Sequence, residues 1–255
     1  ALLRHVVVDT FIDFLVGVTR GTRFAVRVVV EGVRPPYEFA EVLRHLYELG
    51  ARSAPLIAMA GLAIGLVLSL HTRASLARFG AEALIPAGLA MALVRETGPL
   101  TAGLLLSGRI GAGIGAELAA MKVTEQIDAL EAVAVDSFRY LVVTRVAACV
   151  IALPLLTTLM NFTGMLGGFV AETAITGMTF QTYFHEAFTP IQFSDLIPAT
   201  LKTTVFGFII ATVASYMGLH ASRGTEGVGQ ASTRSVVTSS MILIGANVLL
   251  VRLIF

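Results

Sequence analysis

Two adjacent charged residues, Arg95 and Glu96, interrupt an apolar stretch that carries no other charge from residue 83 to residue 108. A charged side chain inside a lipid-embedded stretch is costly, so the pair indicates a polar lining in a substrate path. A structural ion pair, or snorkelling at the membrane edge, stays open. Because consecutive residues point about 100° apart on a helix, Arg95 and Glu96 need not pair with each other, and each can face a different partner. Gly98-Pro99 follows and predicts a helix break.

Small residues recur four apart in the next segment. Gly108, Gly111 and Gly115 lie there among several alanines. In lipid, such faces let helix backbones approach closely, so we expect these glycines to pack against another helix. Residues 111–116 also match G-x-G-x-x-A, but a dinucleotide-binding loop must follow a β-strand, and no strand pattern precedes this one.

A short amphipathic helix is predicted at about residues 117–134. Val123, Ile127 and Leu130 recur at helical spacing, and Thr124 is placed to cap the helix start. The polar positions are Lys122, Thr124, Glu125, Gln126, Asp128 and Glu131. A charged helix held between two membrane spans suits docking onto a soluble partner. A plain interfacial loop is the alternative.

Enzyme signatures are missing from the sequence. Without the pattern G-x-x-x-x-G-K-[ST], the chain is expected not to hydrolyse ATP itself. His185-Glu186 does not extend to H-E-x-x-H, and no G-x-S-x-G occurs. The one cysteine, Cys149, excludes an internal disulfide and a thiolate cluster. We therefore predict no catalytic residue, cofactor or metal site, and a net charge of +1 gives no electrostatic case for nucleic acid.

The composition identifies lipid as the solvent of this chain. Of its 255 residues, 56% are hydrophobic and 14% charged, against about 25% charged in soluble domains. Five membrane spans are predicted at about 52–72, 84–114, 138–171, 195–220 and 232–254. Lys202 is expected to snorkel from the fourth span, and Asn247 to hydrogen-bond across helices. The glycine-rich segment 224–234 is expected to be a loop, with Ser232 or Thr233 capping the last span.

The first fifty residues, 1–50, are predicted to form a region of their own ahead of a transmembrane domain at 51–255. Their charged positions fall on one side of a helix and their apolar positions on the other, which favours a helix lying in the membrane interface. The charged positions are Asp9, Asp13, Arg20, Arg23, Arg27, Glu31 and Arg34, and the apolar ones are Phe11, Phe14, Leu15 and Val18. Pro35-Pro36 ends this helix, and a second short one follows at residues 37–49. Soluble surface helices are the alternative.

The distribution of Lys and Arg sets the predicted orientation. Arginines are frequent in the N-terminal region through Arg52, and the segment 172–194 has neither Lys nor Arg. We therefore expect a multi-pass protein of the cell inner membrane with a cytoplasmic N-terminus and a C-terminus outside. Asp9 and Asp13 interrupt any signal-peptide core, so the first span is expected to act as the targeting signal.

Two blocks of sequence closely resemble the MlaE/YrbE permease family of lipid ABC transporters. The first runs from Arg95 to Ala112 and continues into residues 116–130, with the specific string Val-Thr-Glu-Gln-Ile-Asp-Ala-Leu. The second is Glu-Gly-Val-Gly at residues 226–229, followed by residues 231–237. The resemblance covers roughly residues 40–254.

The resemblance implies an all-α integral membrane protein with an N-terminal interfacial helix, about five transmembrane helices and a cytoplasmic coupling helix. It implies that two copies pair, that each docks on a cytoplasmic ABC ATPase that uses ATP, and that a periplasmic or extracellular MCE-domain protein sits above. The implied substrates are phospholipids or other hydrophobic lipids. By the same resemblance, residues 122–131 form the coupling helix, and Arg95, Glu96 and Thr97 bind substrate at a cavity between the copies, formed by their first, second and fifth spans.

The chain departs from the family pattern at two positions. Thr97 stands where the family typically has an apolar residue, and Asn247 stands where an acidic residue is common. Two alternatives to a lipid permease also stay open. One is an ion-coupled secondary transporter without an ATPase, using Arg95 and Glu96 as a relay. The other is a non-transporting membrane scaffold.

Overall fold

The computed structural model describes residues 2–35, 37–222 and 224–254, and over these ranges the backbone forms helices and turns without a strand. Side chains are described from Val16 to Leu253, apart from residues 36 and 223. The predicted positions that lie outside the described side chains are Asp9, Asp13, Phe11, Phe14, Leu15 and Pro36. The all-α prediction is confirmed.

The α-helices are connected by short turns, and several continue into one another. In chain order they are α1 (Leu2–Val33), α2 (Phe39–Leu46), α3 (Ala54–Leu76), α4 (Ile85–Ala92), α5 (Gly98–Leu106), α6 (Ala112–Val123), α7 (Gln126–Ala132), α8 (Thr144–Thr176), α9 (Phe180–Phe188), α10 (Phe193–Leu219) and α11 (Thr225–Ile254). Wider π-helical turns lie at Tyr47–Ala51, Leu93–Thr97, Ser107–Gly111 and Arg139–Val143.

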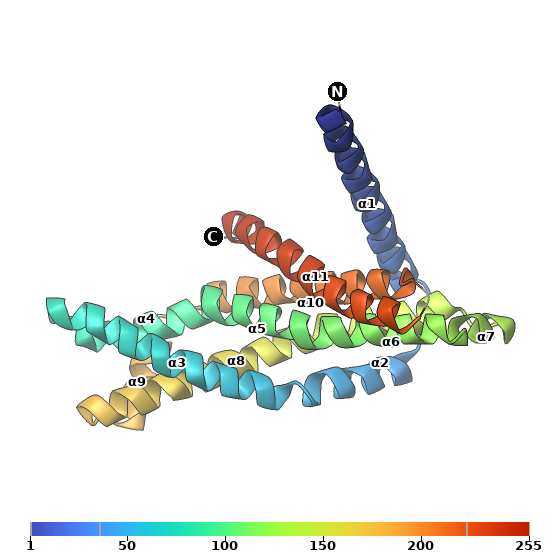
Figure 1. Ribbon diagram of the computed structural model, residues 1–255. Coiled ribbons are helices and arrows are strands. Elements are labelled where there is room, and N and C mark those ends of the chain that lie inside the picture. Colours follow the sequence, from blue (N-terminus) through green and yellow to red (C-terminus); the bar gives the residue numbers. More distant parts are fainter. Residues whose placement is uncertain (1, 36, 223, 255) are drawn as a thin grey trace.

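Five helical stretches in the described chain are long and apolar enough to cross a membrane. They are Phe39–Phe79, Glu82–Val123, Arg139–Thr176, Phe193–Leu219 and Thr225–Leu253. Each contains most or all of one predicted span, which confirms their number and order. The first four form an elongated bundle with α9 at one end and α7 at the other, here called the α9 end and the α7 end (Figure 1). α11 tilts away from α10 towards the C-terminus.

The first and last spans start earlier than predicted. α2 continues through the turn at Tyr47–Ala51 towards α3, so residue 50 is no helix boundary. α2 also packs on α8 and buries His45, which a helix lying on the surface would not do. At the other end α11 begins at Thr225, so the expected loop is helix and neither Ser232 nor Thr233 is its cap.

The second span is continuous where a break was predicted. α4, α5 and α6 follow one another through the turns at Leu93–Thr97 and Ser107–Gly111. Pro99 occupies the first turn of α5, the part of an α-helix that tolerates proline best. The Arg95 carbonyl oxygen, four residues earlier, accepts a hydrogen bond from Lys202 instead of from a backbone N–H. The wider π-helical turn at Leu93–Thr97 accommodates the proline ring, so the helix continues through Gly98-Pro99 and does not end there.

α1 leaves the bundle at a steep angle near the α7 end (Figure 1). Its C-terminal half is attached through Phe24, whose ring lies edge-on to Phe138 with centroids 5.3 Å apart. Arg27 lies over the Phe138 ring at 4.0 Å, and Glu31 pairs with Arg139 at 2.6 Å. Helices at this angle to a membrane bundle fit the predicted position in the interface plane.

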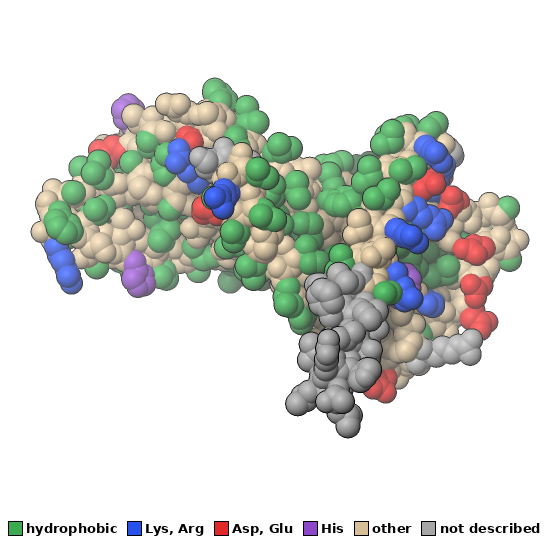
Figure 2. All heavy atoms as spheres, turned by 90° about the horizontal axis from the view of Figure 1, so that it is seen from above, with side chains coloured by type: hydrophobic (Ala, Val, Ile, Leu, Met, Phe, Trp, Pro, Cys, Tyr) green, Lys and Arg blue, Asp and Glu red, His purple; other side chains and the backbone are tan. Residues whose placement is uncertain are grey.

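Close backbone contacts bring α3 and α10 against the central helix α8. A Cβ on Gly65 would lie 1.8 Å from the Gly164 carbonyl oxygen, and one on Gly207 would lie 2.5 Å from the Cys149 carbonyl oxygen. Small residues therefore set these helix distances, as is common in lipid. Apolar side chains cover the middle of the molecule, and charged ones gather most densely towards the α7 end (Figure 2).

Candidate functional site

Glu96 is the centre of a polar network that joins three membrane spans. It lies in the turn Leu93–Thr97, and its Oε1 is 2.9 Å from Nζ of Lys202 on α10. Asn247 on α11 donates its Nδ2–H to Oε2 of Glu96 at 3.2 Å. Lys202 also donates to the Arg95 carbonyl oxygen at 3.0 Å. The second, fourth and fifth spans are thus connected through one carboxylate.

Arg95 faces a different partner, which the helical geometry allows. Its Nη2 lies 2.6 Å from Oδ1 of Asp195, and its Nε lies 3.1 Å from the same oxygen. The other oxygen of Asp195 accepts the backbone N–H of Gln192 at 3.2 Å, and this contact is half of a capping box at the start of α10. Two ion pairs therefore tie the second span to the first three turns of α10.

Lys202 is fully buried, so the expectation that it snorkels is wrong. Its ammonium needs no water because a carboxylate and a backbone carbonyl oxygen accept its hydrogen bonds. The expected cross-helix hydrogen bond of Asn247 is confirmed. Lys202 and Asp195 were missed as members of this site because a separation of about a hundred residues leaves no pattern in a single sequence.

Glu96 and Arg95 each keep one flank uncovered by the chain. Their side chains are 40% and 43% exposed, although they lie within a span, and Thr97 beside them is half-buried. Glu96 lies about 20 Å along the helix from its start at Glu82. A charged group this far into a span does not face hydrocarbon without a large cost. This flank therefore needs water or another protein surface.

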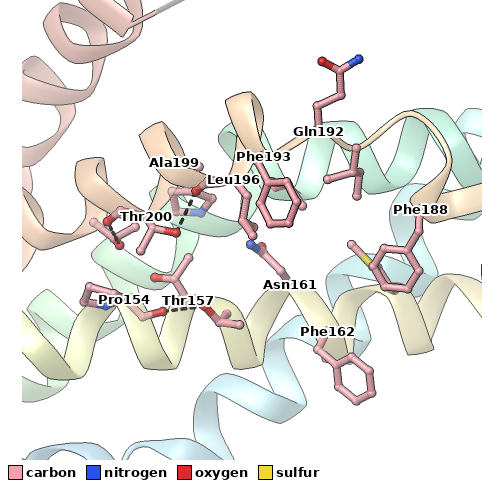
Figure 3. Close-up of a pocket in the computed structure, with 16 residues that line it drawn as sticks. Pro154, Thr157, Asn161, Phe162, Phe188, Gln192, Phe193, Leu196, Ala199 and Thr200 are labelled. Carbon is pink, nitrogen blue, oxygen red and sulfur yellow. Dashed lines mark hydrogen bonds between the residues drawn. The ribbon is translucent and has the colours of Figure 1, made fainter.

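An apolar cavity of about 660 Å³ lies on the other side of the turn, between α8 and α10 (Figure 3). Val94 and Pro99, which flank the charged pair, line it, whereas Arg95, Glu96 and Thr97 do not. Phe188 and Phe193 line it near the α9 end. The cavity and the polar network are thus separate features that share one helical turn.

Asn161 connects this cavity to the second span. Its side chain points from α8 towards α10 (Figure 3), and its Oδ1 would lie 1.7 Å from a Cβ placed on Gly98. Asn161 Oδ1 and Thr157 Oγ1 are buried without a hydrogen-bond partner among the described residues. Gly98 therefore serves close approach between α5 and α8 rather than a helix break.

The predicted docking helix is shorter than expected. α6 continues to Val123, and α7 covers Gln126–Ala132 after a sharp turn in which Glu125 has a φ of 59°. Thr124 does not cap α7, because its hydroxyl donates to the Ala120 carbonyl oxygen of the preceding helix at 2.8 Å. α7 projects beyond the other helices at its end of the bundle (Figure 1).

The polar residues of this segment divide into two groups. Lys122 donates to the Leu219 carbonyl oxygen at the end of α10, and Glu131 accepts a hydrogen bond from Ser137 at 2.6 Å. These two hold the loop in place. Glu125, Gln126 and Asp128 are exposed, while Ile127 and Leu130 face the core. The docking role of this face stays a prediction.

The predicted packing glycines differ from one another. A Cβ on Gly115 would lie 2.3 Å from the Ser235 hydroxyl and 3.2 Å from the Ala231 carbonyl oxygen, so Gly115 lets α6 approach α11 closely. Gly111 has ordinary contacts with α10 and α11. Gly108 is exposed, and no atom lies within 4 Å of a Cβ placed on it, so it packs on no helix of the described chain.

Comparison with known proteins gives a consistent result. The family model described as "Permease MlaE" matches residues 42–253. A protein of Rickettsia bellii named "Probable ABC transporter permease protein" is 36% identical over 91% of this chain and 90% of its own length. The "Intermembrane phospholipid transport system permease protein MlaE" of Haemophilus influenzae is 32% identical over 85% of this chain and 84% of its own length. The chloroplast protein TRIGALACTOSYLDIACYLGLYCEROL 1 of Arabidopsis thaliana is 29% identical over 84% of this chain and 61% of its own length.

Proposed function

The chain belongs to the MlaE permease family, and on that premise we propose that it is the membrane subunit of an ATP-driven phospholipid transporter. It works as two copies, each docked on a cytoplasmic ABC ATPase and both beneath an MCE-domain protein. The proposal extends to this chain what the Haemophilus relative's name says of that protein, a permease for phospholipid transport. The proposal keeps the expectation from the sequence that the chain supplies no ATPase site and binds no cofactor, the ATP being used by the partner ATPase.

The observation that carries the proposal is the half-exposed polar network at Glu96. The carboxylate and the guanidinium of Arg95 are 40% and 43% exposed inside a span. A second copy placed against this flank encloses the exposed parts of both side chains in a cavity between the copies, which water and lipid headgroups fill. Thr97, half-buried in the same turn, adds a hydroxyl near this wall.

We infer that the network also has a second arrangement in the working transporter. Glu96 connects the second span to α10 through Lys202 and to α11 through Asn247. A shift of α11 exchanges these contacts for water or lipid and changes the affinity of the cavity for lipid. ATP binding drives that shift from outside, because α7 presents Glu125, Gln126 and Asp128 to the ATPase.

Affinity purification of the tagged chain from native membranes tests the proposal, with mass spectrometry of the accompanying proteins and lipids. Recovery of an ATPase, an MCE-domain protein and phospholipid supports it. A chain recovered with no ATPase and no lipid, yet moving a solute along an ion gradient in vesicles, would support a secondary transporter instead. If the chain is recovered with partners but transports nothing, either with ATP or along an ion gradient, it is a scaffold.

A further inference from the structure

A second pocket, lined largely by polar residues, lies towards the α7 end, and its lining does not include the network at Glu96. It has a volume of about 310 Å³ and is enclosed by the turn after α2, by α6 with the turn before it, and by the start of α8. Three arginines from these three elements line it: Arg52, Arg109 and Arg145. Arg109 is about 20 Å along the second span from Glu96.

The pocket carries an excess of positive charge. Of its two carboxylates, Glu117 pairs with Arg145 at 2.7 Å, and Glu48 lies 3.6 Å from Arg44 outside the pocket. Arg52 and Arg109 form no ion pair among the described residues, and Arg109 donates its Nε–H to the Ser53 hydroxyl at 3.0 Å. Two guanidinium groups, those of Arg52 and Arg109, therefore line the pocket without an ion-pair partner among the described residues.

Arg145 gives a second, independent indication of an absent ligand or ion. It is 3% exposed, two of its nitrogens are bonded to Glu117 and to the Leu141 carbonyl oxygen, and its Nε is buried without a partner. An unbonded buried donor on a residue that lines the same pocket as two unpaired guanidinium groups is unfavourable in a helical membrane protein. An anion in the pocket balances the charge of the exposed guanidinium groups of Arg52 and Arg109.

We propose that this pocket binds a phosphate group, and that a phospholipid headgroup supplies it. Guanidinium groups hold phosphate oxygens through paired, charge-assisted hydrogen bonds. A volume of about 310 Å³ accommodates a phosphate with its glycerol or headgroup, but not two acyl chains. The inference that a lipid supplies the phosphate rests on the proposed function. The inference that the pocket binds phosphate does not.

Gly113 provides a way to block the pocket without changing its charge. It lines the pocket, and no atom lies within 4 Å of a Cβ placed on it. Gly113→Leu therefore fills the space while leaving all three arginines in place. Arg52→Gln with Arg109→Gln removes the charge instead, and Arg78→Gln, at an exposed arginine in the turn after α3 that does not line the pocket, is the matched control.

The test is native mass spectrometry of the full chain with its co-purifying subunits, without ATP, so it does not depend on transport. The probes are phosphatidylglycerol, diacylglycerol with the same acyl chains, and inorganic phosphate. Lipid held in the cavity at Glu96 is common to all variants. For the additional phosphatidylglycerol site, we expect the arginine variant and Gly113→Leu to bind with about tenfold lower affinity than wild type and Arg78→Gln, as follows from losing hydrogen bonds to a charged group. Diacylglycerol binding is expected to be equal in all of them.

The probes also separate the two sources of phosphate. Retention of phosphatidylglycerol but not of inorganic phosphate supports the lipid headgroup, and equal retention of inorganic phosphate supports a site for free phosphate. Phosphatidylglycerol binding that is unchanged in Gly113→Leu and in the arginine variant would overturn the proposal. If the arginine variant does not fold, Gly113→Leu decides the question alone.

Discussion

At the scale of residues, the Glu96–Lys202 pair is asymmetric. Lys202 is fully buried, whereas 40% of the Glu96 side chain is exposed. Loss of the carboxylate leaves a buried ammonium with a carbonyl oxygen and no counter-charge, whereas loss of the ammonium leaves a carboxylate that water can reach. Charge reversal at Glu96 would confound folding with transport, so neutral replacements are the sharper probes.

Glu96→Gln is expected to destabilise the chain more than Lys202→Met does. Removing the partner of a buried charge lowers the free energy of unfolding by about 3–5 kcal/mol, because the remaining charge stays buried and uncompensated. Removing the buried Lys202 charge instead costs less, because water can reach the remaining Glu96 carboxylate. The double variant removes both charges and is expected to recover most of the loss. Thermal unfolding in detergent measures all three, with Glu82→Gln, an exposed carboxylate, as control. Equal losses in the two single variants would contradict the assigned burial.

The sequence predicted part of this site and missed the rest for a physical reason. A charged pair in an apolar stretch stands out by its cost in lipid, and so Arg95 and Glu96 were found. Lys202 was found as a charge but was expected to reach the membrane edge, because its partner comes from another helix. Asp195 gave no signal at all, since an acid at a helix start is ordinary capping chemistry.

At the scale of elements, the long spans are assembled from shorter helices through π-helical turns. Hydropathy predicted the five spans well, because lipid requires each to be apolar and helical. It predicted their starts poorly at residues 39 and 225, where polar helical segments continue the apolar ones. Glycine spacing predicted that the helices approach closely. It did not predict which glycines do so, since that depends on the helix opposite.

Gly115→Ala is expected to destabilise the chain by about 1–3 kcal/mol, because the new methyl group overpacks the contact between α6 and α11. Ser235→Gly in the same chain removes the nearest atoms and is expected to restore part of the loss. Gly108→Ala is the control, because its Cβ meets nothing within 4 Å in one chain. Thermal unfolding of the three variants checks this, and equal effects at Gly115 and Gly108 would refute the assigned packing.

Asp128→Ala and Glu125→Gly are expected to separate ATP hydrolysis from lipid transport. Both side chains are exposed on or beside α7, and glycine suits the φ of 59° at residue 125, so folding is preserved. We expect lipid moved per ATP to fall about tenfold, which corresponds to a loss of about 1.4 kcal/mol in coupling. Glu38→Gln, on an exposed residue before α2, is the control. Normal transport in both variants would remove α7 from the ATPase contact.

At the scale of the whole molecule, one chain is incomplete as a transport path. The large cavity between α8 and α10 is apolar and lacks the charged pair, while the charged pair faces outward from the chain. Exposed apolar residues on α11, such as Met241 and Val248, lie on the same helix as Asn247. Two copies that meet across α11 and the turn at Glu96 would enclose a path with apolar walls and a polar centre, as a lipid requires.

The most direct measurement is phospholipid movement by the purified complex in proteoliposomes, followed with a fluorescent phospholipid and protein-free acceptor vesicles. The account predicts movement that requires ATP hydrolysis, persists when ion gradients are collapsed, and falls about tenfold or more in Glu96→Gln/Lys202→Met, although that variant folds and assembles. Movement that ignores ATP and follows an ion gradient, or that is unchanged in the double variant, would contradict it.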